Sequence, residues 1–194
     1  NIGTYYMPRL IREFQDRYPG IKVQVKINTT AVVEKELLDG KLDLALVGGT
    51  IQSEHIVAEP LFYEKYTAIC ALEHPMAGKT VLLEEFMKEP LLFREKSSGA
   101  YEVFQSAVNQ TGLTVTPVWE SISQTTLMEA VHYGLGVTIL PEQMIKREIR
   151  EGRLAQITFS DFSFQNTIHI AYHHSKYLSP SIKNFILLIK TLGF

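Results

Sequence analysis

Four segments that precede predicted helices are rich in small hydroxyl or amide residues. They hold Asn1 and Ile2, then Thr29 and Thr30, then Ser97, Ser98 and Gly99, and finally Ser123 and Gln124. Side chains of this kind can donate hydrogen bonds to an anion, together with the backbone N–H groups and the dipole of a helix N-terminus. The pattern is typical of a site for a small anion or polar metabolite. Each segment taken alone also fits an ordinary helix N-cap, which favours Ser, Thr and Asn without any ligand.

A cation and two aromatic residues accompany the third of these segments. Arg94 directly follows the predicted strand 91–93, so its guanidinium could pair with a carboxylate effector. A solvated surface arginine explains the same residue equally well. Tyr101 and Phe104 could line a pocket, although helical spacing favours core packing for Phe104.

Other kinds of chemistry find little support in the sequence. His173 and His174 are neighbours on a predicted strand, where successive side chains point to opposite faces and make a poor metal pair. The sequence has no Cys-x-x-Cys pair, no Gly-x-Ser-x-Gly elbow and no Gly-x-Gly-x-x-Gly loop. Glu84 and Glu85 fit a solvated helix face, and Cys70 fits apolar packing. We therefore predict no enzyme activity, no metal and no cofactor.

Composition limits the class of protein. The chain has 194 residues, a hydrophobic content of 45% and a formal charge of −2, which fits one globular domain or two small lobes. A charge of −2 argues against nucleic-acid binding by this chain alone. One cysteine excludes an intrachain disulfide and fits a reducing, cytoplasmic compartment. No apolar stretch approaches the roughly 20 residues of a membrane span, no signal peptide is visible, and the first residue, Asn1, indicates a fragment or a processed chain.

Hydrophobic periodicity predicts alternating helices and strands. A helix over 4–18 precedes a strictly alternating, half-exposed strand over 21–27, a helix over 29–40 and an apolar strand over 42–47. Strand, helix and strand of this length predict a parallel pair with a right-handed crossover. Two further strands are predicted in 57–72, before a loop. The second set comprises helices over 82–88, 100–112, 124–133 and 141–152, and strands over 91–93, 115–119, 137–140 and 154–157.

A last strand over 167–174 and a last helix over 179–192 remain, and they could join either set. If they return to the first set, the chain crosses between two lobes twice, near 72–77 and 162–167. Lobe I would then comprise 1–72 with 167–194, and lobe II would comprise 77–162. Two crossings form a hinge between the lobes, and small ligands favour the cleft between two such lobes.

One corner of the second set is sharply marked by the stretch GLGVTILP at 134–141. Gly134 or Gly136 can adopt positive φ and end the helix before it. The apolar run that follows predicts a short buried strand. Pro141 is suited to the first turn of the next helix.

Seven pieces in order give the chain a family resemblance. They are LIREFQDRYPGIKVQV, ELLDGKLDLALV, AEPLFYE, EHPMA, PLLFREKSSG, AVHYGLGVTILP and YLSPSIKNFI. Together they cover essentially the whole chain, which resembles the effector-binding domain of LysR-type transcriptional regulators.

The resemblance implies an α/β fold of two Rossmann-like lobes like that of type 2 periplasmic binding proteins. It implies a small polar or anionic effector in the interlobe cleft, contacted by the four polar segments. It also implies a winged helix-turn-helix upstream of Asn1, a strand that usually precedes the segment matching residues 1–8, and a homodimer or homotetramer. The helix 4–18 and the strand 21–27 are the expected dimer surface.

Two other functions are compatible with this fold. An extracytoplasmic solute-binding protein of a transporter would carry a signal peptide or lipobox upstream instead of a helix-turn-helix. An enzyme would need an acid and a base near the site, and no such pair can be placed in the four segments.

Overall fold

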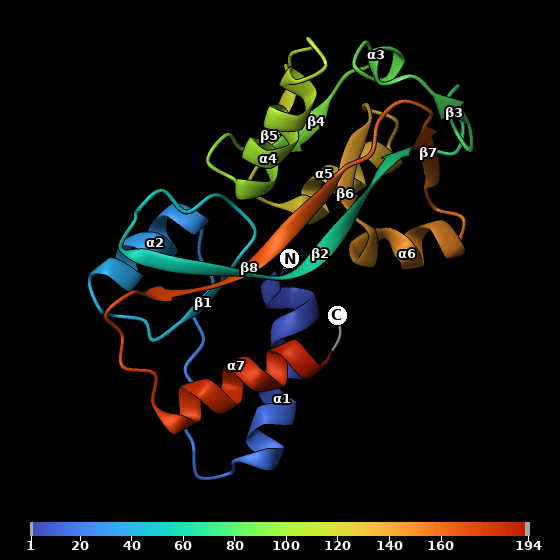
Figure 1. Cartoon of the computed structure of the whole chain (residues 1–194). Helices are drawn as coiled ribbons and strands as arrows, with labels where there is room; N and C mark the ends of the chain where they lie inside the picture. The colour runs from blue at the N-terminus through green and yellow to red at the C-terminus, as the bar shows by residue number, and fades with distance from the viewer. Residues whose placement is uncertain (1, 193–194) are drawn as a thin grey trace. The chain divides into compact units, whose positions relative to one another are not determined.

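The computed structural model describes residues 2–192, and the chain divides into two compact units (Figure 1). The first unit comprises Asn1–Tyr63 with Thr167–Phe194, and the second comprises Glu64–Asn166. The main chain passes between the units within two long strands, β2 (Ile56–Cys70) and β8 (Gln165–His173). Residues 72–77, where the sequence predicted the first hinge segment, follow β2 inside the second unit. The hinge itself stays a prediction.

Helix packing forms the main core of the first unit. Its helical elements are the π-helical turn η1 (Ile2–Tyr6), α1 (Met7–Arg17), α2 (Thr30–Leu38) and α7 (Pro180–Leu192). Leu10 and Phe14 recur at helical spacing on α1 and are buried. The Phe14 ring meets the Phe185 ring of α7 edge-on, with the centroids 5.0 Å apart. Aromatic contact thus joins the first and last helices of the chain.

The strands of the first unit are antiparallel where their pairing is described. β1 (Ala45–Val47) pairs antiparallel with β8 in the register Ala45↔Ala171, and β8 lies next to β2 in the strand order. The predicted parallel pairing of 42–47 with 21–27 is wrong, because residues 21–27 form no strand and β1 pairs antiparallel with β8. Val33 and Leu37 of α2 pack in one core cluster with Val47.

Residues 21–27 form no strand in the structure, although their sequence alternates strictly. Alternation decides which side chains share a face, but a strand also needs a hydrogen-bonded neighbour. Within the described part of the chain, these residues pair with no other strand. Val25 and Ile27 consequently remain 43% and 69% exposed.

The carboxyl half of β2 is the centre of the second unit. It pairs antiparallel with β6 (Thr138–Pro141) and with β7 (Ala155–Phe159), and β7 pairs parallel with β3 (Thr80–Val81). A separate parallel pair joins β4 (Leu92–Arg94) to β5 (Trp119–Ser121). The prediction of two strands within 57–72 is wrong, since β2 runs unbroken across this range. The short strand β3 was not predicted.

Four helices complete the second unit. They are α3 (Leu83–Phe86), α4 (Gly99–Asn109), α5 (Gln124–His132) and α6 (Glu142–Arg150). Phe93 of β4 stacks on Phe104 of α4 with the ring centroids 4.8 Å apart. Both Phe104 and Tyr101 are buried. The core assignment of Phe104 is therefore confirmed, and aromatic packing fixes α4 against β4.

The corner at 134–141 forms largely as predicted. Gly134 has a φ of 73°, and the chain then enters the buried strand β6. A Cβ built on Gly136 would lie 2.2 Å from the carbonyl oxygen of Pro90, so this glycine allows two backbone segments to approach. Pro141 is the last residue of β6 and the N-cap of α6, not a residue of its first turn. None of the helices in the described range 2–192 is long and apolar enough to cross a membrane.

Candidate functional site

The parallel strands β4 and β5 end side by side in the second unit. Their last residues, Arg94 and Ser121, are register partners. Each strand is followed by a short loop and a helix, so that α4 begins after Ser98 and α5 begins after Ser123 (Figure 1). Ligands of α/β folds bind at the carboxyl ends of parallel strands, where helix N-termini supply N–H groups. The third and fourth predicted segments therefore lie together at the carboxyl ends of β4 and β5, a place that we call the β4–β5 edge.

Ser123 is a true N-cap. Its hydroxyl oxygen accepts a hydrogen bond from the Thr126 backbone N–H at 3.2 Å. The Ser121 hydroxyl accepts from the Ser123 N–H at 3.0 Å and lies 3.2 Å from the Ser123 carbonyl, to which it can donate. Gln124 is the first residue of α5 and is half-buried. These local bonds give the loop after β5 a defined shape.

Ser98 differs from Ser123 although both precede a helix. Ser98 is 5% exposed, and its side chain makes no capping hydrogen bond to α4. Its backbone closes the turn instead, because the Ser98 N–H donates to the Glu95 carbonyl at 2.9 Å. Ser97 is exposed and Gly99 is half-buried at the first position of α4. The Ser98 hydroxyl is thus not used to cap the start of α4.

Arg94 forms a two-bond ion pair with the residue that follows it. Its Nε donates to Glu95 Oε2 at 2.8 Å, and its Nη2 donates to Glu95 Oε1 at 3.0 Å. The two side chains are only 20% and 17% exposed. The reading of Arg94 as a solvated surface residue is therefore wrong. Glu95 was not predicted as a site residue, although an acid directly after a candidate anion-binding arginine was a visible signal in the sequence.

A buried polar cluster surrounds Tyr66 in the same unit as Arg94. Burial raises the pKa of the Tyr66 phenol well above its usual range, and the charge and hydrogen bonding of Glu64 raise it further. A hydrogen bond from Asn166 and the positive charge of Arg94 act in the opposite direction. Glu64 and Asn166 are themselves buried. Arg94 thus lies close enough to this cluster to influence the ionisation of its phenol.

The first and second predicted segments belong to the first unit. Thr29 is the N-cap of α2 without a side-chain capping bond, and Thr30 is its first residue. Both are half-buried, as is Ile2 in η1. Asn1 lies outside the described residues. The convergence of all four segments on one cleft stays a prediction.

Glu34 is a buried polar residue that the sequence analysis did not single out. It lies on α2 and is 9% exposed. Its Oε1 accepts hydrogen bonds from the backbone N–H groups of Gln52 at 3.0 Å and Ser53 at 2.7 Å. One carboxylate therefore fixes the loop after β1 against the helix that Thr29 begins.

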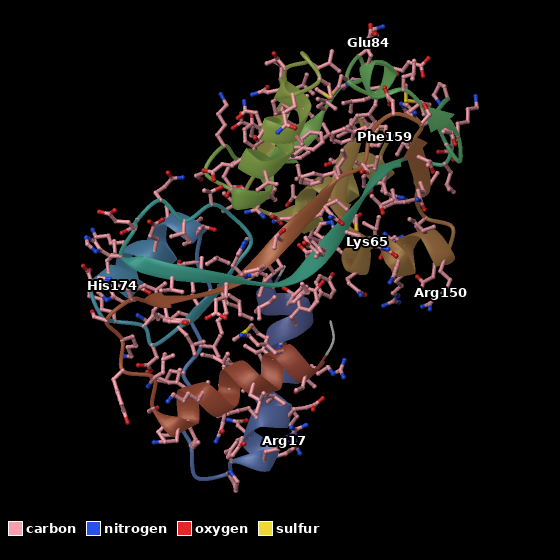
Figure 2. All side chains as sticks on the ribbon, viewed as in Figure 1. Arg17, Lys65, Glu84, Arg150, Phe159 and His174 are labelled. Carbon is pink, nitrogen blue, oxygen red and sulfur yellow. The ribbon has the colours of Figure 1, made fainter. Side chains whose placement is uncertain are left out.

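The histidines at the end of β8 do not point apart as predicted. The rings of His173 and His174 have centroids 4.8 Å apart, and the His55 ring lies 5.2 Å from that of His174 (His174 is labelled in Figure 2). The alternation rule fails because β8 ends at His173. Among the described residues, no group of three or more His, Cys, Asp or Glu side chains could hold a metal ion. Cys70 is fully buried, and burial raises its thiol pKa to about 11.

Comparison with known families identifies the class of this chain. The family described as the LysR substrate binding domain matches residues 1–193. The chain belongs to the LysR substrate-binding domain family.

Regulators of transcription are among its curated relatives. The chain is 25% identical over 189 residues to the HTH-type transcriptional regulator YeiE of Escherichia coli K12, a match that covers 95% of this chain and 63% of YeiE. It is 30% identical over 190 residues to the HTH-type transcriptional activator CmpR of Synechocystis PCC 6803, covering 95% of this chain and 61% of CmpR. The chain thus spans slightly more than six tenths of the length of these relatives.

Solved structures confirm the predicted fold class. The effector binding domain of QuiR in complex with shikimate matches with a TM-score of 0.86 at 18% identity, covering 99% of this chain and 92% of that one. The regulatory domain of Synechocystis PCC 6803 CcmR in complex with 2-PG matches with a TM-score of 0.86 at 23% identity, covering 97% and 91%. The fold is the α/β fold of LysR effector-binding domains, which is like that of type 2 periplasmic binding proteins.

Proposed function

We propose that this chain is the ligand-sensing regulatory domain of a LysR-type transcription factor. The observation that carries the proposal is the family match over residues 1–193, together with relatives that are regulators of transcription. The net charge of −2 supports a division of labour in which an upstream helix-turn-helix contacts DNA. The same relatives favour a regulator over a solute-binding protein of a transporter. A cytoplasmic location follows from a role in transcription, and a sensor needs no catalysis or cofactor.

The effector is a small polar or anionic metabolite. Shikimate, bound by the QuiR domain, is a hydroxylated carboxylic acid, which is the kind of molecule that hydroxyl-rich loops and an arginine can hold. In this chain, the supporting geometry is the paired ends of β4 and β5 with two helix N-termini beyond them. The backbone N–H groups at the start of α4 and α5 can bind an acid group of the effector.

The side chains at this edge have distinct roles in the proposal. Arg94 supplies the positive charge, and Ser98 offers a hydroxyl that its own helix does not use. Ser97, Gly99, Ser123 and Gln124 shape the two loops and supply backbone donors. Thr29, Thr30, Ile2 and Asn1 are proposed as further contacts from the first unit.

Signal transmission would follow a shift in population. An effector that binds one conformation of the domain more tightly than another raises the population of that conformation, and the size of the shift is set by the difference in affinity. In the full-length regulator, this change would alter the position of the upstream DNA-binding domains.

Self-association is the second part of the proposal. The contact surface is formed by α1 and residues 21–27 of the first unit. A groove of about 320 Å³ lies between them, lined by Gly3, Met7, Pro8, Ile11, Arg12, Gln15 and Val25. Exposed apolar side chains at Val25 and Ile27 continue this surface. A second copy that presents the same surface would cover the apolar side chains of both copies.

A binding screen tests the sensing role. We expect a hit when the chain is screened by thermal shift against sulfate, phosphate, shikimate, other small hydroxycarboxylates and amino-acid precursors. A ligand present at about 100 times its Kd adds about 2.7 kcal/mol to the free energy of unfolding. Titration calorimetry then compares the wild type with Arg94→Gln, for which we expect binding of an acidic hit to weaken at least tenfold.

The double variant Ser98→Ala/Ser123→Ala tests the two serines of the β4–β5 edge. Its matched control is Ser160→Ala. Ser160 belongs to the same unit but donates to the Val81 carbonyl at 3.4 Å and is not part of the β4–β5 edge. The double variant should bind the hit more weakly, and the control should bind like the wild type. A folded wild-type protein that binds no member of the panel would contradict the sensing role.

A further inference from the structure

We propose that Glu95 sets the charge selectivity of the effector site, because its carboxylate competes with anions for Arg94 and disfavours those with more than one negative charge. This inference rests on the proposed function, since it deepens the role of the β4–β5 edge. It identifies the effector as a monoanion or zwitterion with hydroxyl groups, in preference to a dianion such as sulfate.

The number of donors on Arg94 and of acceptors on Glu95 limits how an anion can bind. A guanidinium has five N–H donors, and Glu95 takes two of them, one on Nε and one on Nη2. Both carboxylate oxygens of Glu95 are engaged. Arg94 therefore keeps donors on its Nη1–Nη2 edge, but an anion there would lie near the negative charge of Glu95. The pair can orient an acid group while supplying little net positive charge.

The Arg94–Glu95 ion pair is more buried than other ion pairs of similar length. The ion pair Arg147–Glu151 at the end of α6 is short as well, at 2.8 Å, but its side chains are 73% and 41% exposed. Water and salt screen such a pair, so it has little influence on a third charge. The Arg94 and Glu95 side chains are 20% and 17% exposed, where screening is weaker. The Glu95 charge therefore acts on any anion that approaches Arg94.

The turn after β4 holds Glu95 in place. Successive side chains of a strand point to opposite faces, yet Arg94 and Glu95 meet because β4 ends at Arg94. The Glu95 carbonyl accepts from the Ser98 N–H at 2.9 Å, and Ser98 is the N-cap of α4. The turn that begins α4 thus holds the Glu95 backbone directly beside the proposed donors.

Other charged groups in the same unit add to the effect of Glu95. The phenol of Tyr66 is influenced both by Arg94 and by the buried carboxylate of Glu64. Glu64 and Arg94 thus act in opposite directions on one phenol, and Glu95 pairs with Arg94 directly. The exposed Lys96 adds a positive charge on the solvent side. This balance favours a ligand with one negative charge and disfavours one with two.

Calorimetry on the wild type and Glu95→Gln tests the inference, with sulfate as the dianion, lactate as a hydroxylated monoanion and glycerol as a neutral polyol. Glutamine keeps the shape and one acceptor oxygen but removes the charge. We expect Glu95→Gln to bind sulfate at least tenfold more tightly than the wild type does. Lactate should also bind more tightly, but the change in its log Kd should be less than half of the change for sulfate. Glycerol binding should not change. Because the effect is electrostatic, added salt should diminish it.

Two further variants separate charge from fold and geometry. Glu151→Gln removes an exposed carboxylate from a similar pair at the end of α6 and should leave all affinities unchanged. Glu95→Asp keeps the charge on a shorter side chain, so it should retain the wild-type preference between lactate and sulfate. Since it retains the charge, this variant gives a readout even if Glu95→Gln fails to fold: loss of the preference in folded Glu95→Asp would overturn the inference.

The possible outcomes distinguish this inference from the proposed function. Weaker anion binding in Glu95→Gln would show that Glu95 only positions Arg94, and would overturn the inference. Anion binding that needs Arg94 but is unaffected by Glu95→Gln would also overturn it, while the sensing role would stand. No binding of sulfate or lactate by either the wild type or Glu95→Gln would overturn this inference, while the sensing role would be decided by the wider screen.

Discussion

At the scale of single residues, long-range partners decide what a polar side chain does. Glu34, Arg94 and Glu95 look like ordinary surface charges in the sequence, but each is largely buried and hydrogen-bonded. The role of Ser123 was predictable because an N-cap bonds to residues two or three positions along the same chain. The role of Glu34 was not, because its partners follow it by 18 and 19 positions.

Replacing Glu34 tests whether its carboxylate holds the loop after β1. Glu34→Ala leaves the N–H groups of Gln52 and Ser53 without their acceptor in a partly buried place. We expect the free energy of unfolding to fall by about 1–3 kcal/mol, measured by urea denaturation. Glu34→Gln should lose less, because an amide oxygen can still accept both bonds.

Glu84→Ala is the control for this experiment. The Glu84 side chain is 63% exposed, pairs with Lys88 beyond the end of α3 and points away from the ribbon (Figure 2). Its loss should change stability by less than about 0.5 kcal/mol. Equal stability of Glu34→Ala and Glu84→Ala would show that the loop does not depend on Glu34.

At the scale of elements, periodicity predicted helices better than strands. The apolar spacing in α1, α4 and α7 was enough because a helix satisfies its own backbone hydrogen bonds. Residues 21–27 alternate as a strand should but pair with no described strand. The break expected within 57–72 is absent because β2 has neighbours along its length. Strand prediction therefore failed where it depended on a partner far away in the sequence.

The corner after α5 gives a test at this scale. Gly136→Val would place a Cβ within 2.2 Å of the Pro90 carbonyl oxygen, which belongs to the backbone and cannot simply rotate away. We expect a loss of about 3 kcal/mol or more in the free energy of unfolding, because two backbone segments must separate. Folding should be damaged before ligand binding is, so thermal denaturation is the measurement.

Gly20→Ala is the matched control for the corner. A Cβ at Gly20 would meet nothing within 4 Å, and its backbone does not adopt positive φ. It should change stability by less than about 1 kcal/mol. A Gly136→Val protein that melts at the wild-type temperature would contradict the close approach at this corner.

At the scale of the whole molecule, the sequence predicted the α/β class because seven ordered pieces resemble a known family, and the family match confirms that resemblance. The return of the last strand to the first half was left open, since periodicity does not specify pairing. The structure resolves it through the antiparallel register of β8 with β1. Pairing also explains why Val25 and Ile27 are exposed, because residues 21–27 lack a described neighbouring strand.

Self-association through this surface gives a prediction for the whole chain. Val25→Lys/Ile27→Lys adds two charges where the side chains are 43% and 69% exposed, so the fold of one copy should tolerate them. In a symmetric dimer each substitution occurs twice, and burying an isoleucine contributes about 1.5–3 kcal/mol. We expect the dimer dissociation constant, measured by sedimentation over a range of concentrations, to rise at least a hundredfold. Leu187→Lys, at an exposed position of α7, should leave it unchanged. If the double variant remains a dimer with an unchanged dissociation constant, the copies associate through another surface, because an interface centred on α1 and residues 21–27 could not bury four lysine ammonium groups without a large loss of affinity.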